Sequence, residues 1–403
     1  MLNTACRARS EVGRVPCPGG VTMPRPRRAP ETMRMRSPRR RWRIVAGCAL
    51  DGAERSLTHR GAPVQMLTWP ATDRYLNLAE IPAFLALVQR KERAWWRIVL
   101  TVLLGAVGFF LVGLLGMPIA AGLGMGLLAA MGEPATFGRA LDIALSTGGT
   151  DTSGSLAAEG VRIVTLGVLF AGLALTLLLT LAAVNRRPMR SWITAAPRFR
   201  WRLMLLGLTL YAGVLAVVLG VSVLSGDDSL RPPLFTPGEP LDARLLYAGV
   251  VLLAIPLAAA FEEILCRGWM MQLTGAFSRN LIVLLLVNGA IFSGLHLDPD
   301  PGRFVARLAS GVAFSWAALR LGGLEFAIGA HAANNLMIAL FAQTITANLS
   351  DTTPASAVEI AIELAAAVAL MGLAELTLRW APLRQWSGAG LTASAAAAPR
   401  PSA

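Results

Sequence analysis

Long apolar runs alternate with short polar segments along the chain from Ile98 onward. A membrane-spanning helix needs about 20 mostly apolar residues. Runs that approach or reach this length lie at 98–115, 163–184, 203–224, 245–271, 281–297, 304–319, 324–342 and 358–378. The pattern predicts an all-α fold, a polytopic membrane helix bundle with about eight transmembrane helices. A further run, 118–131, is too short to cross a membrane by itself, so it either extends the first helix or lies at the membrane interface.

The composition agrees with a membrane protein. Of the 403 residues, 55% are hydrophobic and 15% are charged, whereas soluble domains carry about 25% charged residues. The net charge of +13 is concentrated in the first 45 residues and in the loops between apolar runs. This distribution is typical of membrane topology rather than of a nucleic-acid-binding face, so we expect the lipid bilayer, and no nucleic acid, as a partner.

Charge also predicts the orientation in the membrane. The loop 185–202 holds six arginines and no acidic residue, whereas the loop 225–244 holds four acidic residues and two arginines. Cytoplasmic loops carry the excess of Lys and Arg, so both termini are expected in the cytoplasm. We expect an integral protein of a bacterial inner (plasma) membrane.

The ends of the chain differ from its middle. Residues 1–65 are rich in Arg, Pro and Gly and lack apolar periodicity, which predicts a disordered N-terminal region, taken here as residues 1–89. The alternative is that the protein starts at Met66 and the stretch before it is not translated. The membrane domain is expected at 90–380 and a disordered C-terminal tail at 381–403.

Three ionisable residues fall inside the apolar stretch "PLAAAFEEILCRGWMMQLTG": Glu262, Glu263 and Arg267. Each charge at the centre of a span costs about 2.5–3.5 kcal/mol on insertion scales, so such residues generally mark function. Glu263 and Arg267 are four positions apart on a predicted long helix and can pair. Glu262 points about 100° away from that pair, so it needs a partner on another helix or stays protonated.

Two histidines and an asparagine lie in later apolar runs. His296 ends "NGAIFSGLH", and His331 opens "HAANN", in which Asn335 shares its face at a spacing of four. A single intramembrane His or Asn is often only an interhelical hydrogen bond, worth about 1 kcal/mol. Together with Glu262, however, these side chains form an acid–base set, and we therefore expect a functional site.

Three motifs resemble one family. "EEILCR" fits EExxxR, "FSGLH" fits FxxxH and "HAANN" fits HxxxN, in that order. The chain thus resembles the CPBP intramembrane proteases, which include type II CAAX prenyl endopeptidases and the Abi-like proteins of bacteriocin processing or self-immunity. Cys266 departs from the larger residue usual before the arginine, and we expect a change of packing there rather than loss of activity.

The resemblance implies roles for the residues. Glu262 and His296 would activate the attacking water, His331 and Asn335 would stabilise the oxyanion, and Glu263 with Arg267 would be supporting residues. The leading mechanism needs no cofactor. The alternative is a metalloprotease in which Glu262, His296 and His331 hold Zn²⁺, since a Glu and two His are also a catalytic zinc ligand set.

The resemblance makes 90–380 an intramembrane endopeptidase domain that acts on a membrane-associated or lipidated peptide or protein. A prenylated CAAX tail, a peptide pheromone, a bacteriocin leader and a membrane-anchored regulator are all compatible substrates. The competing hypothesis is a non-catalytic membrane protein on the same fold, either a transporter or an immunity or scaffold protein. Transporters often show repeated halves with broken spans, and the sequence has no such repeat.

Overall fold

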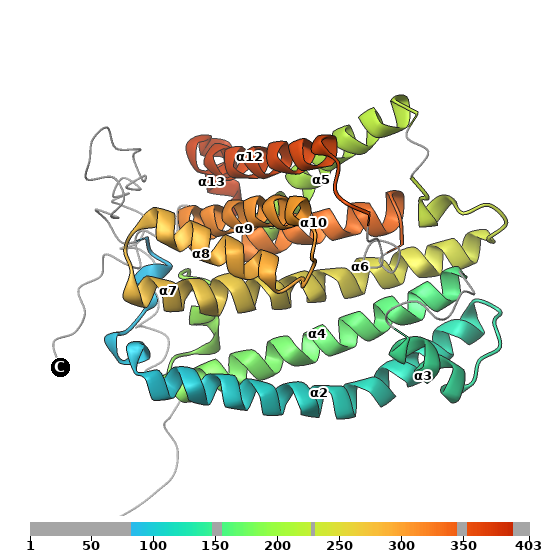
Figure 1. The fold of residues 1–403 in the computed structure, drawn as a ribbon, viewed down its shortest axis with the longest axis horizontal. Coiled ribbons are helices and arrows are strands. Elements are labelled where there is room, and N and C mark those ends of the chain that lie inside the picture. The colour runs from blue at the N-terminus through green and yellow to red at the C-terminus, as the bar shows by residue number, and fades with distance from the viewer. Residues whose placement is uncertain (1–81, 147–154, 227–229, 345–352, 390–403) are drawn as a thin grey trace, which may run out of the picture. The chain divides into compact units, whose positions relative to one another are not determined.

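The computed structural model describes residues 82–146, 155–226, 230–344 and 353–389 (Figure 1). The predicted disorder of residues 1–81 and the alternative start at Met66 lie outside these residues. The described residues belong to one compact unit, 61–403. They form helices, with one isolated bridge between Thr194 and Gly323 and no β-strand among them. The predicted all-α fold is confirmed for this part of the chain.

The α-helices follow one another with short connections. They are α2 (Trp95–Ala130), α3 (Phe137–Leu145), α4 (Leu156–Asn185), α5 (Trp201–Leu224), α6 (Leu241–Glu263), α7 (Met271–Phe277), α8 (Leu281–Gly294), α9 (Pro301–Leu321), α10 (Glu325–Phe341), α12 (Ala357–Arg379) and α13 (Ala381–Ser387). A π-helical segment, η5 (Ile264–Met270), joins α6 to α7. Four 3₁₀ turns complete the described elements: η1 (Leu85–Leu87), η2 (Arg90–Arg93), η3 (Met189–Trp192) and η4 (Pro233–Phe235).

Helices occupy all eight predicted spans. Six are long and apolar enough to cross a membrane: α2, α4, α5, the continuous helix Leu241–Phe277, α9 and α12. The other two, α8 and α10, have 14 and 17 residues. The run 118–131 extends the first helix, because α2 continues to Ala130. The chain is thus an integral membrane protein.

The helices pack in a layered order (Figure 1). α2 packs on α4 and α4 on α6, while α10 packs on both α6 and α5 and α9 packs between α8 and α12. The crossing of α5 and α10 depends on a glycine. A Cβ atom on Gly329 would lie 1.9 Å from the carbonyl oxygen of Met204, and small residues of this kind allow membrane helices to approach closely.

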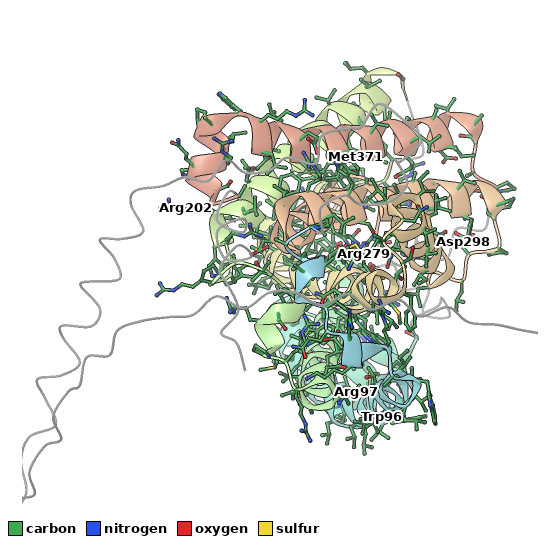
Figure 2. The ribbon with its side chains drawn as sticks, turned by 90° about the vertical axis from the view of Figure 1, so that its left-hand side faces the viewer. Trp96, Arg97, Arg202, Arg279, Asp298 and Met371 are labelled. Atoms are coloured by element: carbon green, nitrogen blue, oxygen red, sulfur yellow. The ribbon has the colours of Figure 1, made fainter. Side chains whose placement is uncertain are left out.

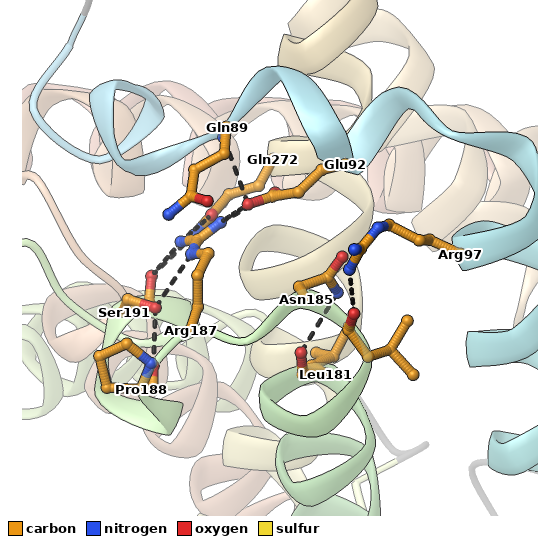
Figure 3. Close-up of polar contacts among 10 residues, drawn as sticks. Gln89, Glu92, Arg97, Leu181, Asn185, Arg187, Pro188, Ser191 and Gln272 are labelled. Atoms are coloured by element: carbon orange, nitrogen blue, oxygen red, sulfur yellow. Dashed lines mark hydrogen bonds and ion pairs between the residues drawn. The ribbon is translucent and has the colours of Figure 1, made fainter. Parts of the chain in front are cut away.

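A buried ion pair fixes the segment before α2. Nη1 of Arg187, just after α4, donates to both carboxylate oxygens of Glu92 at 2.9 Å, and its Nη2 donates to Gln272 at 2.9 Å (Figure 3). Phe84 and Leu85 are buried in the core beside this pair. Residues 82–89 are therefore ordered although the sequence predicts disorder there, because Phe84 and Leu85 are buried in the core.

The C-terminal boundary also differs from the prediction. The tail was expected to be disordered from residue 381, whereas Ala381–Ser387 forms α13. Pro382 lies in the first turn of this helix, where proline is tolerated, and Gly388 ends it in the left-handed conformation at φ 72°. The rest of the predicted tail, 390–403, lies outside the described residues.

Candidate active site

Glu262 and Glu263 end α6, at the point where the helix changes its hydrogen-bonding pattern. The predicted long helix is confirmed, since the chain stays helical from Leu241 to Phe277. The π-helical segment Ile264–Met270 within it was not predicted. Such segments are rare and are frequent at functional sites. Close packing accompanies it here, because a Cβ atom on Gly268 would lie 2.6 Å from the carbonyl oxygen of Trp192.

The predicted pair of Glu263 and Arg267 is confirmed. Nη1 of Arg267 donates to Oε1 of Glu263 at 2.9 Å, and both side chains are fully buried. The guanidinium also donates to the carbonyl of Gly311 at 3.0 Å and lies 4.5 Å over the ring of Phe292. Arg267 thereby joins η5 to α9. The other carboxylate oxygen of Glu263, Oε2, is buried and has no hydrogen-bond partner among the described residues.

His331 of α10 contacts both glutamates. Its Nδ1 lies 2.9 Å from Oε1 of Glu263 and its Nε2 lies 3.6 Å from Oε2 of Glu262. The expected partner of Glu262 on another helix is thus His331. Glu262 and Glu263 are adjacent in sequence, yet both reach the imidazole of His331 because its two ring nitrogens face different directions. The 3.6 Å contact is too long for a hydrogen bond, so the polar atoms of Glu262 and His331 can bind the same small group.

His296 is not inside a helix, contrary to the prediction. α8 ends at Gly294, and the amides of Leu295 and His296 bond back to the last turn. Leu297 then adopts a left-handed φ of 53°, uncommon for a non-glycine residue. Nδ1 of His296 lies 2.8 Å from the carbonyl oxygen of Phe292, which leaves Nε2 for other partners. The apolar run concealed this helix end, since Leu295 and Leu297 continue it in sequence.

Phe292 links the two histidines. Its ring centroid lies 4.9 Å from that of His296 and 5.7 Å from that of His331. The Phe292 side chain is itself buried. Phe314 of α9 stacks on His331 with centroids 5.0 Å apart. Glu262, His331 and His296 therefore lie around one aromatic centre.

The residues around this centre differ in their exposure to solvent. His331 is buried, the Glu262 side chain is 25% exposed, and His296 is exposed. Hence the centre opens on the side of His296. Asn335, the remaining predicted site residue, accepts a hydrogen bond from Asn334 at 3.2 Å. Within the described part of the chain it makes no hydrogen bond to Glu262, His296 or His331.

Three residues of α9 that contribute to the candidate site were not predicted from the sequence. Gly311 accepts from Arg267, Ser315 Oγ lies 3.4 Å from its Nε, and Phe314 covers His331. The available signal was the small residues Gly311 and Ser315, four positions apart on one face of an apolar run. Cys266, where a change of packing is expected, is buried with a free thiol.

The zinc alternative can be compared with the geometry. Among the described residues, no group of three or more His, Cys, Asp or Glu side chains is arranged to hold a metal ion. Nδ1 of His331 is occupied by Glu263, whose other neighbour is the cation Arg267. This bond leaves Nε2 of His331 free to act as a ligand, so the zinc alternative with Glu262, His296 and His331 stays a prediction.

The segment that carries these residues resembles one known family. Residues 244–337 match the Rce1-like type II CAAX prenyl endopeptidases. The Rce1-like segment includes every candidate site residue from Glu262 to Asn335, and the resemblance predicted from the three motifs is confirmed. The chain is also 26% identical over 165 residues to the uncharacterized protein YyaK of Bacillus subtilis (strain 168). This alignment covers 39% of the chain and 54% of YyaK, so the chain spans about half the length of that relative. No solved structure matches the chain.

Proposed function

We propose that the protein is an intramembrane endopeptidase that hydrolyses a peptide bond in a membrane-associated or lipidated substrate. The observation that carries this proposal is the 3.6 Å approach of Glu262 and His331 from two different helices, beside a partly open centre. The likeness of this segment to a family of endopeptidases supports the same reaction class.

In the proposed reaction, Glu262 and His296 hold a water molecule at the open side of the centre. Glu262 accepts a proton from this water as the water oxygen attacks the carbonyl carbon of the scissile peptide bond. His331 and Asn335 donate hydrogen bonds to the oxyanion, and each such donor in a dry site can contribute several kcal/mol. When the C–N bond breaks, the leaving amine takes up the proton.

Glu263 and Arg267 act through His331 in this scheme. Because Nδ1 of His331 donates to Glu263, the ring is held with Nε2 toward Glu262. Nε2 of His331 and the Glu262 carboxylate attract each other only if one of them carries a proton. In the proposed reaction, a proton on Nε2 is donated as a hydrogen bond to the oxyanion. Glu263 sets the direction of Nε2 without touching the substrate, so its role is one of positioning.

The reaction is proposed without a metal, with Zn²⁺ held by Glu262, His296 and His331 as the alternative mechanism. Activity that survives strict chelation and reconstitution in metal-free buffer would support the first. Strict restoration by Zn²⁺ of a chelated, inactive protein would instead establish the second.

The site is proposed to lie within a bacterial inner membrane, with both termini in the cytoplasm. The alternation of basic and acidic loops supports this orientation. Labelling of single cysteines introduced at Arg279 and Asp228 by a membrane-impermeant thiol reagent tests it. Reaction of the Arg279 position only after permeabilisation, and of the Asp228 position before it, is the expected result.

The function is tested with Glu262→Gln in the full-length protein reconstituted in vesicles. Reporter peptides that carry a prenylated CAAX tail or a bacteriocin-type leader provide the substrates. We expect wild-type cleavage of at least one reporter and a loss of about 10²–10⁴ in Glu262→Gln. Glu133→Gln, which removes a partly exposed carboxylate outside the site, is the control. Equal cleavage by Glu262→Gln and wild type would favour a non-catalytic transporter, immunity or scaffold protein.

A further inference from the structure

A second candidate site lies beside the C-terminal part of the long helix Leu241–Phe277, which carries Glu262 in its interior. A cleft opens where the start of α2, the end of α4 and the junction of η5 with α7 meet, and its enclosed part measures about 10 Å³. Its polar lining includes Glu92, Arg97, Asn185 and Trp192, and its apolar lining includes Ile98 and Leu273. The inner end has room for only one water-sized group.

Arg97 is the free cation of this cleft. The charge of Glu92 is matched by Arg187, which donates to both of its oxygens. Arg97 donates to the carbonyl of Val184 (Figure 3). Its guanidinium also lies 4.5 Å over the ring of Trp96. No carboxylate among the described residues pairs with Arg97. Its remaining N–H groups therefore favour an oxygen-rich anion.

Trp192 provides a second, independent indication of a ligand. Its side chain is 1% exposed, and its indole Nε1 has no hydrogen-bond partner among the described residues. Buried donors are almost always bonded, so an unpartnered one needs an explanation. An acceptor oxygen in the narrow inner end of the cleft would supply the missing bond.

The surroundings of the cleft are those of a membrane interface. Trp95 and Trp96 are 74% and 47% exposed at the start of α2, and tryptophan is enriched at the level of lipid headgroups. The next turn of α2 exposes Val99 and Leu103. Figure 2, which views the bundle from this end, labels Trp96 and Arg97 on α2. Arg93 is also exposed here. Basic sites between membrane helices bind anionic headgroups.

We propose that this cleft binds the headgroup of an anionic phospholipid. Arg97 donates to a phosphate oxygen, and one further lipid oxygen enters the inner end and accepts from Trp192. An acyl chain then runs along Ile98 and Leu273 toward the bilayer. This lipid site is separate from Glu262 and does not depend on the proposed protease activity.

The test uses the full-length protein in a neutral detergent. Short-chain phosphatidylglycerol is titrated while the thermal unfolding midpoint is recorded, with short-chain phosphatidylcholine and inorganic phosphate as parallel arms. We expect phosphatidylglycerol to raise the midpoint by several degrees and the other two to have little effect. The variants are Arg97→Gln and Trp192→Phe, of which the second removes only the indole N–H and keeps an aromatic ring. Arg279→Gln, an exposed arginine on the same end of the bundle (Figure 2), is the matched control.

Arg97→Gln should weaken the apparent affinity for phosphatidylglycerol roughly tenfold or more, since a charge-assisted hydrogen bond is lost. Trp192→Phe should weaken it by a smaller factor, and Arg279→Gln should leave it unchanged. Equal stabilisation by both lipids, or equal affinities for all three variants, would overturn the proposal. Stabilisation by inorganic phosphate at the same concentrations would assign the cleft to a free anion and would also overturn it.

Discussion

The Nδ1 atom of His331 lies 2.9 Å from Oε1 of Glu263, although the two residues are 68 positions apart and lie on different helices. The same carboxylate oxygen accepts a hydrogen bond from Arg267. One buried oxygen thus couples the ion pair of the long helix to the imidazole of α10. This coupling makes Glu263 part of the support of the candidate site rather than only a partner of Arg267.

Glu263→Gln should lower both the cleavage rate and the stability of the protein, since it leaves the buried Arg267 without its counter-charge. The amide can still accept from Nδ1 of His331, but the negative charge that orients the ring and balances Arg267 is lost. We expect a fall of about 10–100-fold in kcat, by analogy with the outer-shell partners of ligand histidines, with KM nearly unchanged. Kinetics on the reconstituted protein measure both. A KM effect without a kcat effect would contradict the positioning role.

Arg267→Met should destabilise the protein by about 3–5 kcal/mol, because it leaves the fully buried Glu263 without its cation. Thermal or denaturant unfolding in detergent measures the change. Arg279→Met, at an exposed position, is the control and should stay within about 0.5 kcal/mol of wild type. Equal stabilities of the two variants would show that the buried pair with Glu263 and the bond from Arg267 to Gly311 contribute little to the stability of the fold.

Gly329→Ala should disrupt the crossing of α5 and α10. The added Cβ would lie 1.9 Å from the backbone oxygen of Met204, so the helices must separate. Overpacking of this kind costs about 1–3 kcal/mol or more. Gly126→Ala in α2 is the matched control, because a Cβ there meets no atom within 4 Å, and alanine favours the helix. If Gly329→Ala were as stable as Gly126→Ala, the close contact between α5 and α10 would be wrong.

Asn335→Ala should reduce turnover if its amide donates to the oxyanion. Loss of one such donor costs about 10²–10³ in kcat. Asn334→Ala removes the neighbouring amide, which bonds to Asn335, and should have a smaller effect. Cleavage assays on both variants decide the order. Greater loss from Asn334→Ala would transfer the proposed role to that residue.

The sequence predicted those features that depend on spacing within one helix. The pairing of Glu263 with Arg267 followed from a spacing of four, and the positions of the helices followed from the length of the apolar runs. The π-helical segment did not follow, because it depends on how Gly268 packs against the backbone of Trp192. The end of α8 before His296 was hidden by leucines on both sides of that residue.

Contacts between helices that are distant in sequence could not be predicted either. Gly311 and Phe314 of α9 surround Arg267 and His331 only because α9 packs on α8 and α10. Nothing in the local sequence assigns them to the site. In contrast, the need of Glu262 for a partner on another helix was predictable from the cost of a lone charge in a membrane, although the identity of that partner was not.

The central claim is that Glu262 and His331 serve one hydrolytic centre. A double-mutant cycle on kcat/KM tests it most directly, with Glu262→Gln, His331→Ala and the combined variant assayed on the same reporter peptide in vesicles. The account predicts that the combined variant is no slower than the slower single variant, because residues that act as a unit are strongly non-additive. Single losses that multiply in the combined variant, or wild-type turnover by Glu262→Gln, would contradict it.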